Sequence, residues 1–468
     1  MVFLYEKGER KLRSVGKKFL TIVSLCILFL VTACSNSNVS GKEQSKVKEN
    51  SEKMSSGKTE IVFWHAMGGK TKEVLEQIVQ KYNQSQDKVE VRALFQGTYD
   101  ESFIKYKNIA GTKDAPDVIQ VFDGGTKYMI DSGKIEPVQK FIDQDKYDVS
   151  QWEPNIRSYY TVDKKQYSMP FNSSTPVMVY NKEAFKEVGL DPDQAPKTFK
   201  EIEEAGKKLT KKEGNQVKRY GFTYLLDTWF FEEMLAVQGG TYVNNDNGRA
   251  KAATKATFNG KEGQRILEFV NNLNKEGING NYGSDWDNTR AAFLAGKTAM
   301  YLDSSAGVKD IINSAPFQVG VAYLPYPEDV QREGVIIGGA SLWMAKDIGK
   351  EKQKAVWEFM KYMTTPSIQA EWHVNTGYFA VNPKAYEEEL VKKEYEKYPQ
   401  LQVTVNQLHD SKVSPATQGA LITVFPESRQ KVQKAMESII EGTDVKQALD
   451  QAAKETDRAL EIANRAKK

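Results

Sequence analysis

The apolar positions after residue 58 recur with two different spacings that alternate along the chain. Residues 60–65, 88–95 and 117–122 have the short apolar-rich runs of strands, and residues 71–85 and 100–110 carry apolar side chains at helical spacing. Parallel neighbouring strands need a crossover connection, which is usually a helix. The alternation therefore predicts an α/β unit with a parallel sheet.

A second group of strand and helix patterns follows. Its members are the strands 177–180, 220–224, 296–301 and 319–325 and the helices 199–209, 229–237, 261–275 and 290–294. Residues 334–345 then suit a strand, residues 351–363 suit a helix, and residues 429–468 look helical throughout. Two α/β patterns in a chain of 468 residues predict two lobes, and ligands favour the cleft between such lobes.

The N-terminal segment has the features of an export signal. Residues 1–18 carry six basic and two acidic side chains, and the apolar run that follows them at residues 19–31 is short for a membrane span. The sequence then reads Val-Thr-Ala-Cys up to Cys34, which resembles a bacterial lipobox. We expect a signal peptide at 1–33, lipidation (palmitate) of Cys34 and a flexible tether at 34–58. The protein would then be anchored on the extracytoplasmic face of the cell membrane. An uncleaved anchor is the alternative.

Cysteine usage and charge narrow the chemistry of the rest of the chain. Cys26 lies in the expected signal peptide and Cys34 is the only other cysteine, so we expect no disulfide, no thiolate metal cluster and no catalytic thiol. Loss of residues 1–33 would remove six basic and two acidic side chains, which changes the formal net charge from +3 to −1. A nearly neutral chain offers no field for nucleic acid.

Signatures of catalysis are incomplete wherever a fragment of one occurs. His65, His373 and His409 show no HExxH or clustered His/Asp spacing of the kind that a metal hydrolase needs. The GKT at residues 69–71 lacks the earlier glycine of a P-loop, and GGASLW at residues 338–343 is not a G-x-S-x-G elbow. We therefore expect no enzyme, no metal and no cofactor. A secreted hydrolase, such as a phosphodiesterase, is the alternative from another class.

Small polar loops at the ends of the predicted strands are the remaining candidates for a site. They lie at residues 97–100, 123–125, 172–175, 303–307 and 338–341. Loops at strand ends bind ligands in open α/β sheets, and glycine lets the backbone approach a ligand closely. Such loops suit an anion or a polyol, although any one of them could be a plain connection.

Several segments together resemble one protein family. They are IVFWHAMGG, QGTYDESF, IQVFDGGT, MPFNSSTPVMVYNKEAFKEVGLDPDQAPKTF, VIIGGASLWM and AEWHVNTGYF, and the similarity runs from about residue 60 to the C-terminus. They resemble the extracellular solute-binding proteins (family 1) of ABC importers, and most of all those that bind sn-glycerol 3-phosphate.

The resemblance implies an α/β, two-lobed periplasmic-binding-protein-like fold of type II. Each lobe would hold a mixed, mostly parallel sheet flanked by helices, with a hinged cleft between the lobes. We expect the N-terminal lobe at 59–171 and 302–345, and the C-terminal lobe at 172–301 and 346–468.

The resemblance also implies a set of ligand-binding residues. These are Tyr99, Asp123, Ser174, Trp229, Ser305, Gly339, Tyr378 and Arg429, with Ser304 and Gly338 as alternatives to their neighbours. A planar Arg429 fork suits a phosphate, and Asp123 can accept from glycerol hydroxyls. The chain departs from the family pattern at two positions. Asp123 stands where Glu is usual, and Leu226 stands where a second Trp is expected three positions before Trp229, which weakens the aromatic wall.

The resemblance implies a lipid-anchored monomeric receptor that binds sn-glycerol 3-phosphate or a glycerophosphodiester and delivers it to ABC permease subunits in the membrane. A maltodextrin-like oligosaccharide-binding protein of the same fold is the alternative, because sugar sites use aromatic platforms and acidic side chains.

The stretch FNSSTPVMVYNK at residues 171–182 combines two expected roles. It lies where the first α/β pattern ends and the second begins, so we expect it to form the first crossing between the lobes. Pro170 and Pro176 restrict the backbone at its ends. Ser174 is expected to donate a hydrogen bond into the cleft.

Overall fold

A computed structural model of the chain describes residues 57–466. The expected signal peptide at 1–33, Cys34 and nearly all of the expected tether at 34–58 lie outside the described residues. Within 57–466, no helix is both long and apolar enough to cross a membrane.

The first lobe is built on a mixed sheet with the strand order β2-β1-β3-β13-β4, in which β7 also pairs with β13. The two parallel pairs join β1 (Thr59–His65) to β2 (Val89–Phe95) and to β3 (Val118–Phe122). The antiparallel pairs join β13 (Gly338–Ala345) to β3, β4 (Ile135–Glu136) and β7 (Met169–Ser174). The helices of this part of the chain are α1 (Gly69–Ser85), α2 (Tyr99–Ile109), α3 (Thr126–Asp131), α4 (Gln139–Asp145) and α5 (Pro154–Tyr160), with the short hairpin β5 (Thr161–Val162) and β6 (Lys165–Gln166).

The second lobe is built on a sheet with the order β11-β8-β12, in which both pairs are antiparallel. Its strands are β8 (Pro176–Asn181), β11 (Met300–Ser304) and β12 (Val319–Ala322), and a separate hairpin is formed by β9 (Lys211–Glu213) and β10 (Gln216–Arg219). The surrounding helices are α6 (Lys182–Glu187), α7 (Phe199–Leu209), α8 (Thr228–Val237), α9 (Asn244–Asn247), α10 (Lys261–Lys275), α11 (Trp286–Leu294) and α12 (Val308–Ser314).

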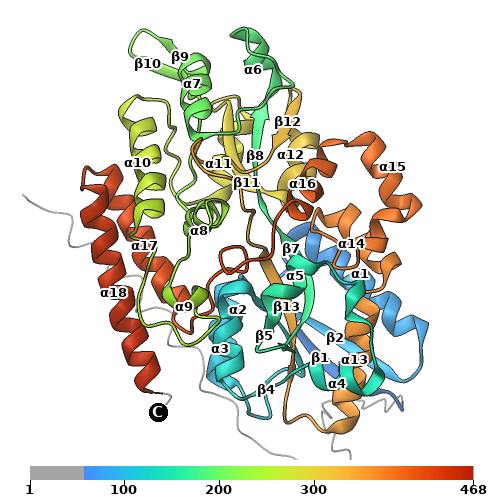
Figure 1. Cartoon of the computed structure of the whole chain (residues 1–468). Helices are drawn as coiled ribbons and strands as arrows, with labels where there is room; N and C mark the ends of the chain where they lie inside the picture. Colours follow the sequence, from blue (N-terminus) through green and yellow to red (C-terminus); the bar gives the residue numbers. More distant parts are fainter. Residues whose placement is uncertain (1–56, 467–468) are drawn as a thin grey trace, which may run out of the picture. The chain divides into compact units, whose positions relative to one another are not determined.

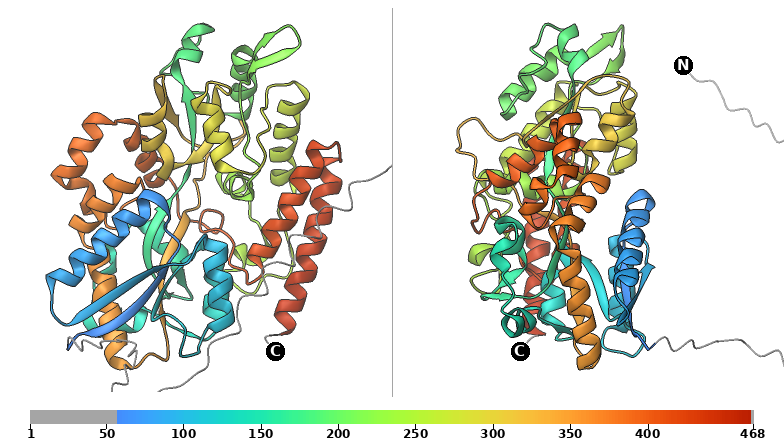
Figure 2. Two further views of the ribbon diagram at one scale, coloured as in Figure 1. Left: turned by 180° about the vertical axis from the view of Figure 1, so that it is seen from behind. Right: turned by 90° about the vertical axis from the view of Figure 1, so that its right-hand side faces the viewer.

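The C-terminal part of the chain is helical and serves both lobes. Its helices are α13 (Lys350–Met363), α14 (Pro366–Thr376), α15 (Glu389–Lys397), α16 (Gln400–His409), α17 (Phe425–Ile440) and α18 (Val445–Arg465), and the 3-10 turns of the chain are η1 (Asp123–Gly125), η2 (Val149–Gln151), η3 (Ser305–Gly307) and η4 (Pro383–Glu387). Helices α17 and α18 lie side by side, and both pack against α10 (Figures 1 and 2). The expected continuous helix at 429–468 is therefore interrupted, because the turn at 441–444 contains Gly442 at φ 105°.

The predicted fold class is confirmed, but the pairing inside the sheets is less parallel than the strand–helix alternation indicated. The second sheet is antiparallel, and residues 220–224 form isolated bridges in place of a strand. Antiparallel neighbours such as β8 and β11 are separated by many residues in the sequence. Local periodicity therefore does not reveal their direction.

The first crossing between the lobes falls within residues 171–182, three residues after the expected boundary at 171/172, because residues 172–174 still pair in the first sheet. β7 belongs to the first sheet and β8 to the second, and Thr175 alone separates them. Both strands are buried along their whole length. Pro176 occupies the first position of β8, a place in a strand that proline tolerates.

Two segments pack in the lobe opposite to the one expected. Helices α13 and α14 bury Trp357, Phe359 and Trp372 in the core of the first lobe, although residues 346–468 were assigned to the second. Helix α12 and strand β12 belong to the second lobe, where β12 pairs with β8, although residues 302–345 are expected in the first. An apolar face shows that a helix or strand is buried, but it does not show which sheet will cover it.

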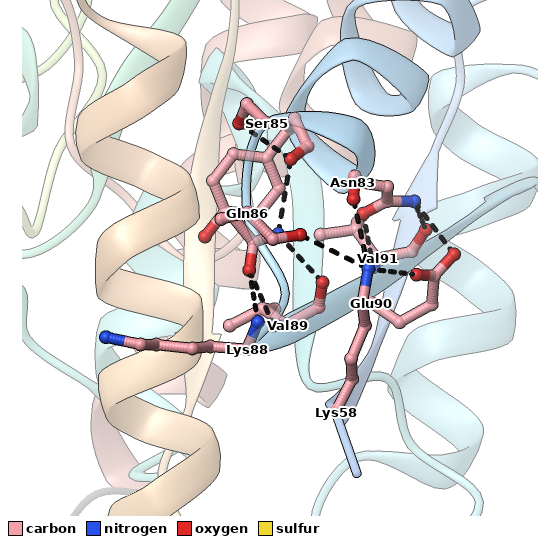
Figure 3. A network of polar contacts seen from close by, with 9 residues as sticks. Lys58, Asn83, Ser85, Gln86, Lys88, Val89, Glu90 and Val91 are labelled. Carbon is pink, nitrogen blue, oxygen red and sulfur yellow. Dashed lines mark hydrogen bonds and ion pairs between the residues drawn. The ribbon is translucent and has the colours of Figure 1, made fainter. Parts of the chain in front are cut away.

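A polar network fixes the start of the described chain (Figure 3). Lys58 Nζ donates to the carbonyl oxygens of Asn83 and Gln86 at 3.1 and 3.2 Å. The side chain of Gln86 closes the turn from α1 to β2 through Val89, and Asn83 Oδ1 accepts from Val91 N. This network holds the beginnings of β1 and β2, which are the ends of these strands remote from the site.

Candidate functional site

A cavity of about 580 Å³ lies between the strand ends of the first lobe and helices α8, α11 and α17 of the second. Seven of the eight predicted ligand-binding residues line it: Tyr99, Asp123, Ser174, Trp229, Gly339, Tyr378 and Arg429. Ser305 does not line it, and its neighbour Ser304 does. Residues that are far apart in the sequence thus converge on one space.

Arg429 and two carboxylates form the charged centre of the site. Its Nε and Nη2 atoms donate to the two oxygens of Glu232 at 2.7 Å each, and Nη2 also donates to Asp123 Oδ2 at 2.7 Å. The two-point contact with Glu232 is the geometry that guanidinium and carboxylate groups favour. The Nε–Nη2 edge of Arg429, which would suit two-point binding of a phosphate, is therefore occupied by Glu232. The remaining nitrogen, Nη1, donates to no residue of the described chain.

Burial and charge act against each other on these groups. Burial alone would lower the pKa of Arg429, but Asp123 and Glu232 raise it well above its ordinary value, so the guanidinium stays charged. Burial raises the pKa of Glu232 to about 7, even though Arg429 opposes that shift. One guanidinium shared between two carboxylates does not compensate both of them fully.

Small residues let the two lobes approach each other at this centre. A Cβ on Gly124 would lie 3.2 Å from Arg429 Nη1, and a Cβ on Gly338 would lie 2.8 Å from the Trp229 ring. Gly339 has φ 101°, and a Cβ there would lie 2.0 Å from the carbonyl oxygen of Asn172. The GG pair at the start of β13 is thus required both by the backbone conformation and by the tryptophan packed on it.

Tyr99 is held by a chain of amide side chains. Its hydroxyl accepts from Asn172 Nδ2 at 2.7 Å, and Asn172 Oδ1 accepts from Gln120 Nε2 at 2.7 Å. Gln120 Oε1 in turn accepts from the backbone N of Ala66. Burial raises the pKa of Tyr99 well above its ordinary value, so its phenol keeps its proton. Because the oxygen already accepts from Asn172, that proton is left to donate, and the Tyr378 hydroxyl lies within hydrogen-bond reach of it.

Tyr378 is positioned by the end of α14. Gly377 closes the helix at φ 77°, and the Tyr378 ring stacks on Trp372 at 5.8 Å with an interplanar angle of 13°. His373 Nδ1 lies 2.6 Å from the Tyr378 carbonyl oxygen, which can only accept. Burial lowers the pKa of His373 to about 4, so this buried histidine is a neutral donor that fixes the Tyr378 backbone.

Two indole rings form one wall of the cavity. Trp229 and Trp286 lie 5.9 Å apart at an interplanar angle of 34°. Asp227 organises both: its carboxylate accepts from Trp229 N at 2.9 Å and from Trp286 Nε1 at 2.8 Å. Leu226 does stand in the cavity, as expected. The aromatic wall is nevertheless not weakened by it, because α11 supplies the second tryptophan from 57 residues beyond Trp229.

The two candidate serines at η3 have different roles. Ser305 is fully buried, its Oγ accepts from Thr175 N at 3.1 Å, and its N donates to the Thr175 carbonyl oxygen at 2.8 Å. It therefore ties β11 to the first crossing. Ser304 caps η3 and reaches the cavity, so the alternative serine is the one in position to meet a ligand.

Sequence reasoning missed Glu232, Asp227 and Trp286. Glu232 sits in the apolar stretch TWFFEEMLAV, where an acid is unusual, and a buried acid of this kind normally has a partner. Asp227 carried the signal of a helix N-cap, which is the position it occupies in α8. Nothing in the sequence around Trp286 indicated that it would meet Trp229.

The arrangement is suited to holding a small polar ligand. Aromatic faces, hydroxyl donors and carboxylate acceptors surround the space, and Arg429 is its one basic group among the described lining residues. No cluster of metal-ligating side chains occurs within the described part of the chain.

Comparison with known proteins agrees with this picture. Residues 77–403 match the sequence family described as bacterial extracellular solute-binding protein. The chain is 34% identical over 420 residues to the sn-glycerol-3-phosphate-binding periplasmic protein UgpB of Yersinia pseudotuberculosis, covering 87% of this chain and 94% of that protein.

Solved structures that share the fold include the following two. UgpB from Mycobacterium tuberculosis in complex with glycerophosphocholine has a TM-score of 0.74 at 21% identity, covering 87% of this chain and all (100%) of that one. The cyclic alpha-maltosyl-1,6-maltose binding protein from Arthrobacter globiformis has a TM-score of 0.72 at 24% identity, covering 86% and 99%. At these identities the likeness establishes the two-lobed fold.

Proposed function

Because the chain belongs to the bacterial extracellular solute-binding proteins, we propose that it captures sn-glycerol 3-phosphate or a glycerophosphodiester between its two lobes. Proteins of this family bind a small solute and deliver it to an ABC permease. The family also confirms the prediction of a transport component over a hydrolase.

The observation that carries the proposal is the convergence of the seven predicted residues on one cavity. In the proposed complex the phosphate lies near Arg429 Nη1 and the hydroxyls of Ser174 and Tyr378. Asp123 accepts from the glycerol hydroxyls, and the Trp229 face covers the apolar side of the glycerol chain. Closure of the lobes buries these polar groups, so a ligand that leaves them unpaired binds poorly.

Oligosaccharide binding is the second candidate, and the paired rings of Trp229 and Trp286 beside Asp227 favour it. Sugars stack on such aromatic faces and donate hydroxyls to carboxylates. In that case Arg429 would pair with no charge on the ligand and would only join the two lobes through Asp123.

Calorimetric titration of the full-length chain in detergent separates the two candidates. The ligands are sn-glycerol 3-phosphate, glycerophosphocholine and maltotriose. We expect sub-millimolar binding of at least one of the two phosphates and none of maltotriose. Binding of maltotriose alone would overturn the proposal.

We also propose that residues 1–33 are removed, that Cys34 carries the lipid anchor, and that the mature protein is a monomer. The apolar run before Cys34 and the small residues beside it support the anchor. Metabolic labelling with palmitate tests it: a Cys34→Ala variant is expected to lose the label and leave the membrane fraction. Retention of the label would exclude Cys34.

A further inference from the structure

Glu232 is a buried acid that lines no part of the cavity, yet it touches the centre of the site. Its two carboxylate oxygens accept hydrogen bonds from Nε and Nη2 of Arg429. Because α8 and α17 share the core of the second lobe, this contact does not depend on closure of the cleft. Any ligand that reaches Arg429 therefore meets a guanidinium that already has a full carboxylate partner.

The charge count at this centre is negative. Arg429 contributes one positive charge, and Asp123 and Glu232 contribute one formal negative charge each. Asp100 and Asp227 add two further carboxylates on the cavity wall. An incoming anion therefore experiences net repulsion from the fixed charges, and the repulsion is stronger for a doubly charged ligand than for a singly charged one.

The surroundings of Glu232 make it easier to protonate than an exposed glutamate. The charged and titratable groups that face it are Arg429 of α17, Asp123 of η1, Asp227 and Glu233 of α8, and the phenols of Tyr224 and Tyr242. Burial is the main cause of the raised pKa of Glu232, with Arg429 opposing it and Asp123 and Asp227 adding to it. The two phenols stay neutral because burial raises their pKa as well.

On the basis of the proposed function, we propose that Glu232 is a specificity-determining residue that makes the cleft favour singly charged phosphodiesters over doubly charged phosphomonoesters. A phosphomonoester carries nearly two negative charges at pH well above about 6, whereas a phosphodiester carries one. Arg429 can balance only one of the two carboxylates that it contacts, and the Glu232 carboxylate is the one left over. A phosphomonoester dianion binds together with a proton, which Glu232 takes up.

The test compares two ligands that share the glycerol phosphate and differ in charge. The probes are sn-glycerol 3-phosphate and sn-glycero-3-phosphoglycerol, whose second glycerol is neutral. The affinity of each ligand is measured on the full-length chain from pH 5.5 to pH 8.5. The ratio of diester affinity to monoester affinity should rise at least about tenfold over this range, because one pKa unit of linkage corresponds to a factor of ten. At pH 8, calorimetry in two buffers of different ionisation enthalpy should show proton uptake with the monoester and little with the diester.

Variants then assign the effect to Glu232. Glu232→Gln removes the charge at nearly constant volume and should remove most of the pH dependence of the ratio. It should also strengthen monoester binding relative to diester binding by about tenfold at pH 8. Glu233→Gln is the matched control, because Glu233 is also buried but does not contact Arg429. Its carboxylate accepts from Ile336 N, and burial raises the pKa of Glu233 well above its ordinary value. Glu233→Gln should leave the ratio and its pH dependence unchanged.

The outcomes separate this inference from the proposed function. If neither phosphate binds the wild-type chain, the proposed function fails, and the inference fails with it. If both bind with a ratio that does not change with pH and without proton uptake, the inference is overturned while the proposed function stands. The wild-type measurements decide this even where Glu232→Gln does not fold.

Discussion

Arg429 Nη2 lies 2.7 Å from Asp123 Oδ2, and this contact joins helix α17 of the second lobe to η1 of the first. Arg429 also holds Glu232, which belongs to its own lobe. Separation of the lobes would therefore break the Asp123 contact and leave the Glu232 contact intact. The cross-cleft pair is the one that a ligand in the cavity must accommodate or replace.

Arg429→Met is expected to abolish binding of sn-glycerol 3-phosphate and to destabilise the fold. Removal of one partner of a buried ion pair typically costs about 3 kcal/mol or more, because the remaining charge is uncompensated. Titration calorimetry and urea unfolding measure the two effects. The double variant Arg429→Met/Glu232→Gln should regain much of the stability without regaining the ligand. Unchanged affinity in Arg429→Met would show that the ligand does not use this residue.

Ser174→Ala is expected to weaken ligand binding by about tenfold, the worth of roughly one hydrogen bond to a charged group, with little change in the midpoint of thermal unfolding. Ser174 lines the cavity and its hydroxyl donates to no described residue in the free protein. Ser173→Ala is the matched control, because neighbouring side chains of a strand point to opposite faces. Equal losses of affinity in the two variants would remove Ser174 from the site.

The serines before and inside η3 should respond in opposite ways. Ser305→Ala removes the acceptor of Thr175 N and should lower the free energy of unfolding by about 1 kcal/mol while leaving affinity nearly unchanged. Ser304→Ala should weaken binding and cost less stability. Chemical denaturation and calorimetry of both variants check this assignment, and a stable Ser305→Ala protein that has lost its ligand would reverse it.

Local sequence predicted the strand-end loops that carry part of the site, and the family resemblance singled out residues within them. Asp123 directly follows β3 and Ser174 is the last residue of β7, so a strand sets the position of each. The Glu232–Arg429 pair could not be predicted in this way, because its members are 197 positions apart and meet only when α8 and α17 pack together. The same limit applies to Trp286, which restores an aromatic wall that the sequence around Leu226 indicated to be incomplete.

The division into lobes shows the same limit at a larger scale. The first crossing could be expected near residue 172 because β7 and β8 are adjacent in sequence, and the structure has it at Thr175. The placement of α13 was wrong, because its apolar face could cover either sheet and only the folded chain shows that it covers β1.

His65 provides a test of the first lobe that does not depend on the ligand. It ends β1, is fully buried beside Phe63 and Phe95, and neither ring nitrogen has a hydrogen-bond partner among the described residues. Burial, with a smaller contribution from Lys72, lowers the pKa of His65 from 6.5 to about 4. Between these two pH values the unfolded chain binds a proton that the folded chain does not, so stability is lost as the pH falls from about 6.5 to 4.

The His65 shift corresponds to about 3 kcal/mol of unfolding free energy over that pH range. His65→Phe should therefore flatten the acid side of the stability profile measured by urea unfolding at several pH values. It should not remove the slope, because His373 is shifted in the same direction. His409→Gln is a control of opposite sign: its hydrogen bond to Glu153 raises the pKa of His409, so its contribution is present at low pH and is lost as the pH rises. A His65→Phe profile parallel to that of the wild-type chain would mean that the folded first lobe admits a proton at His65.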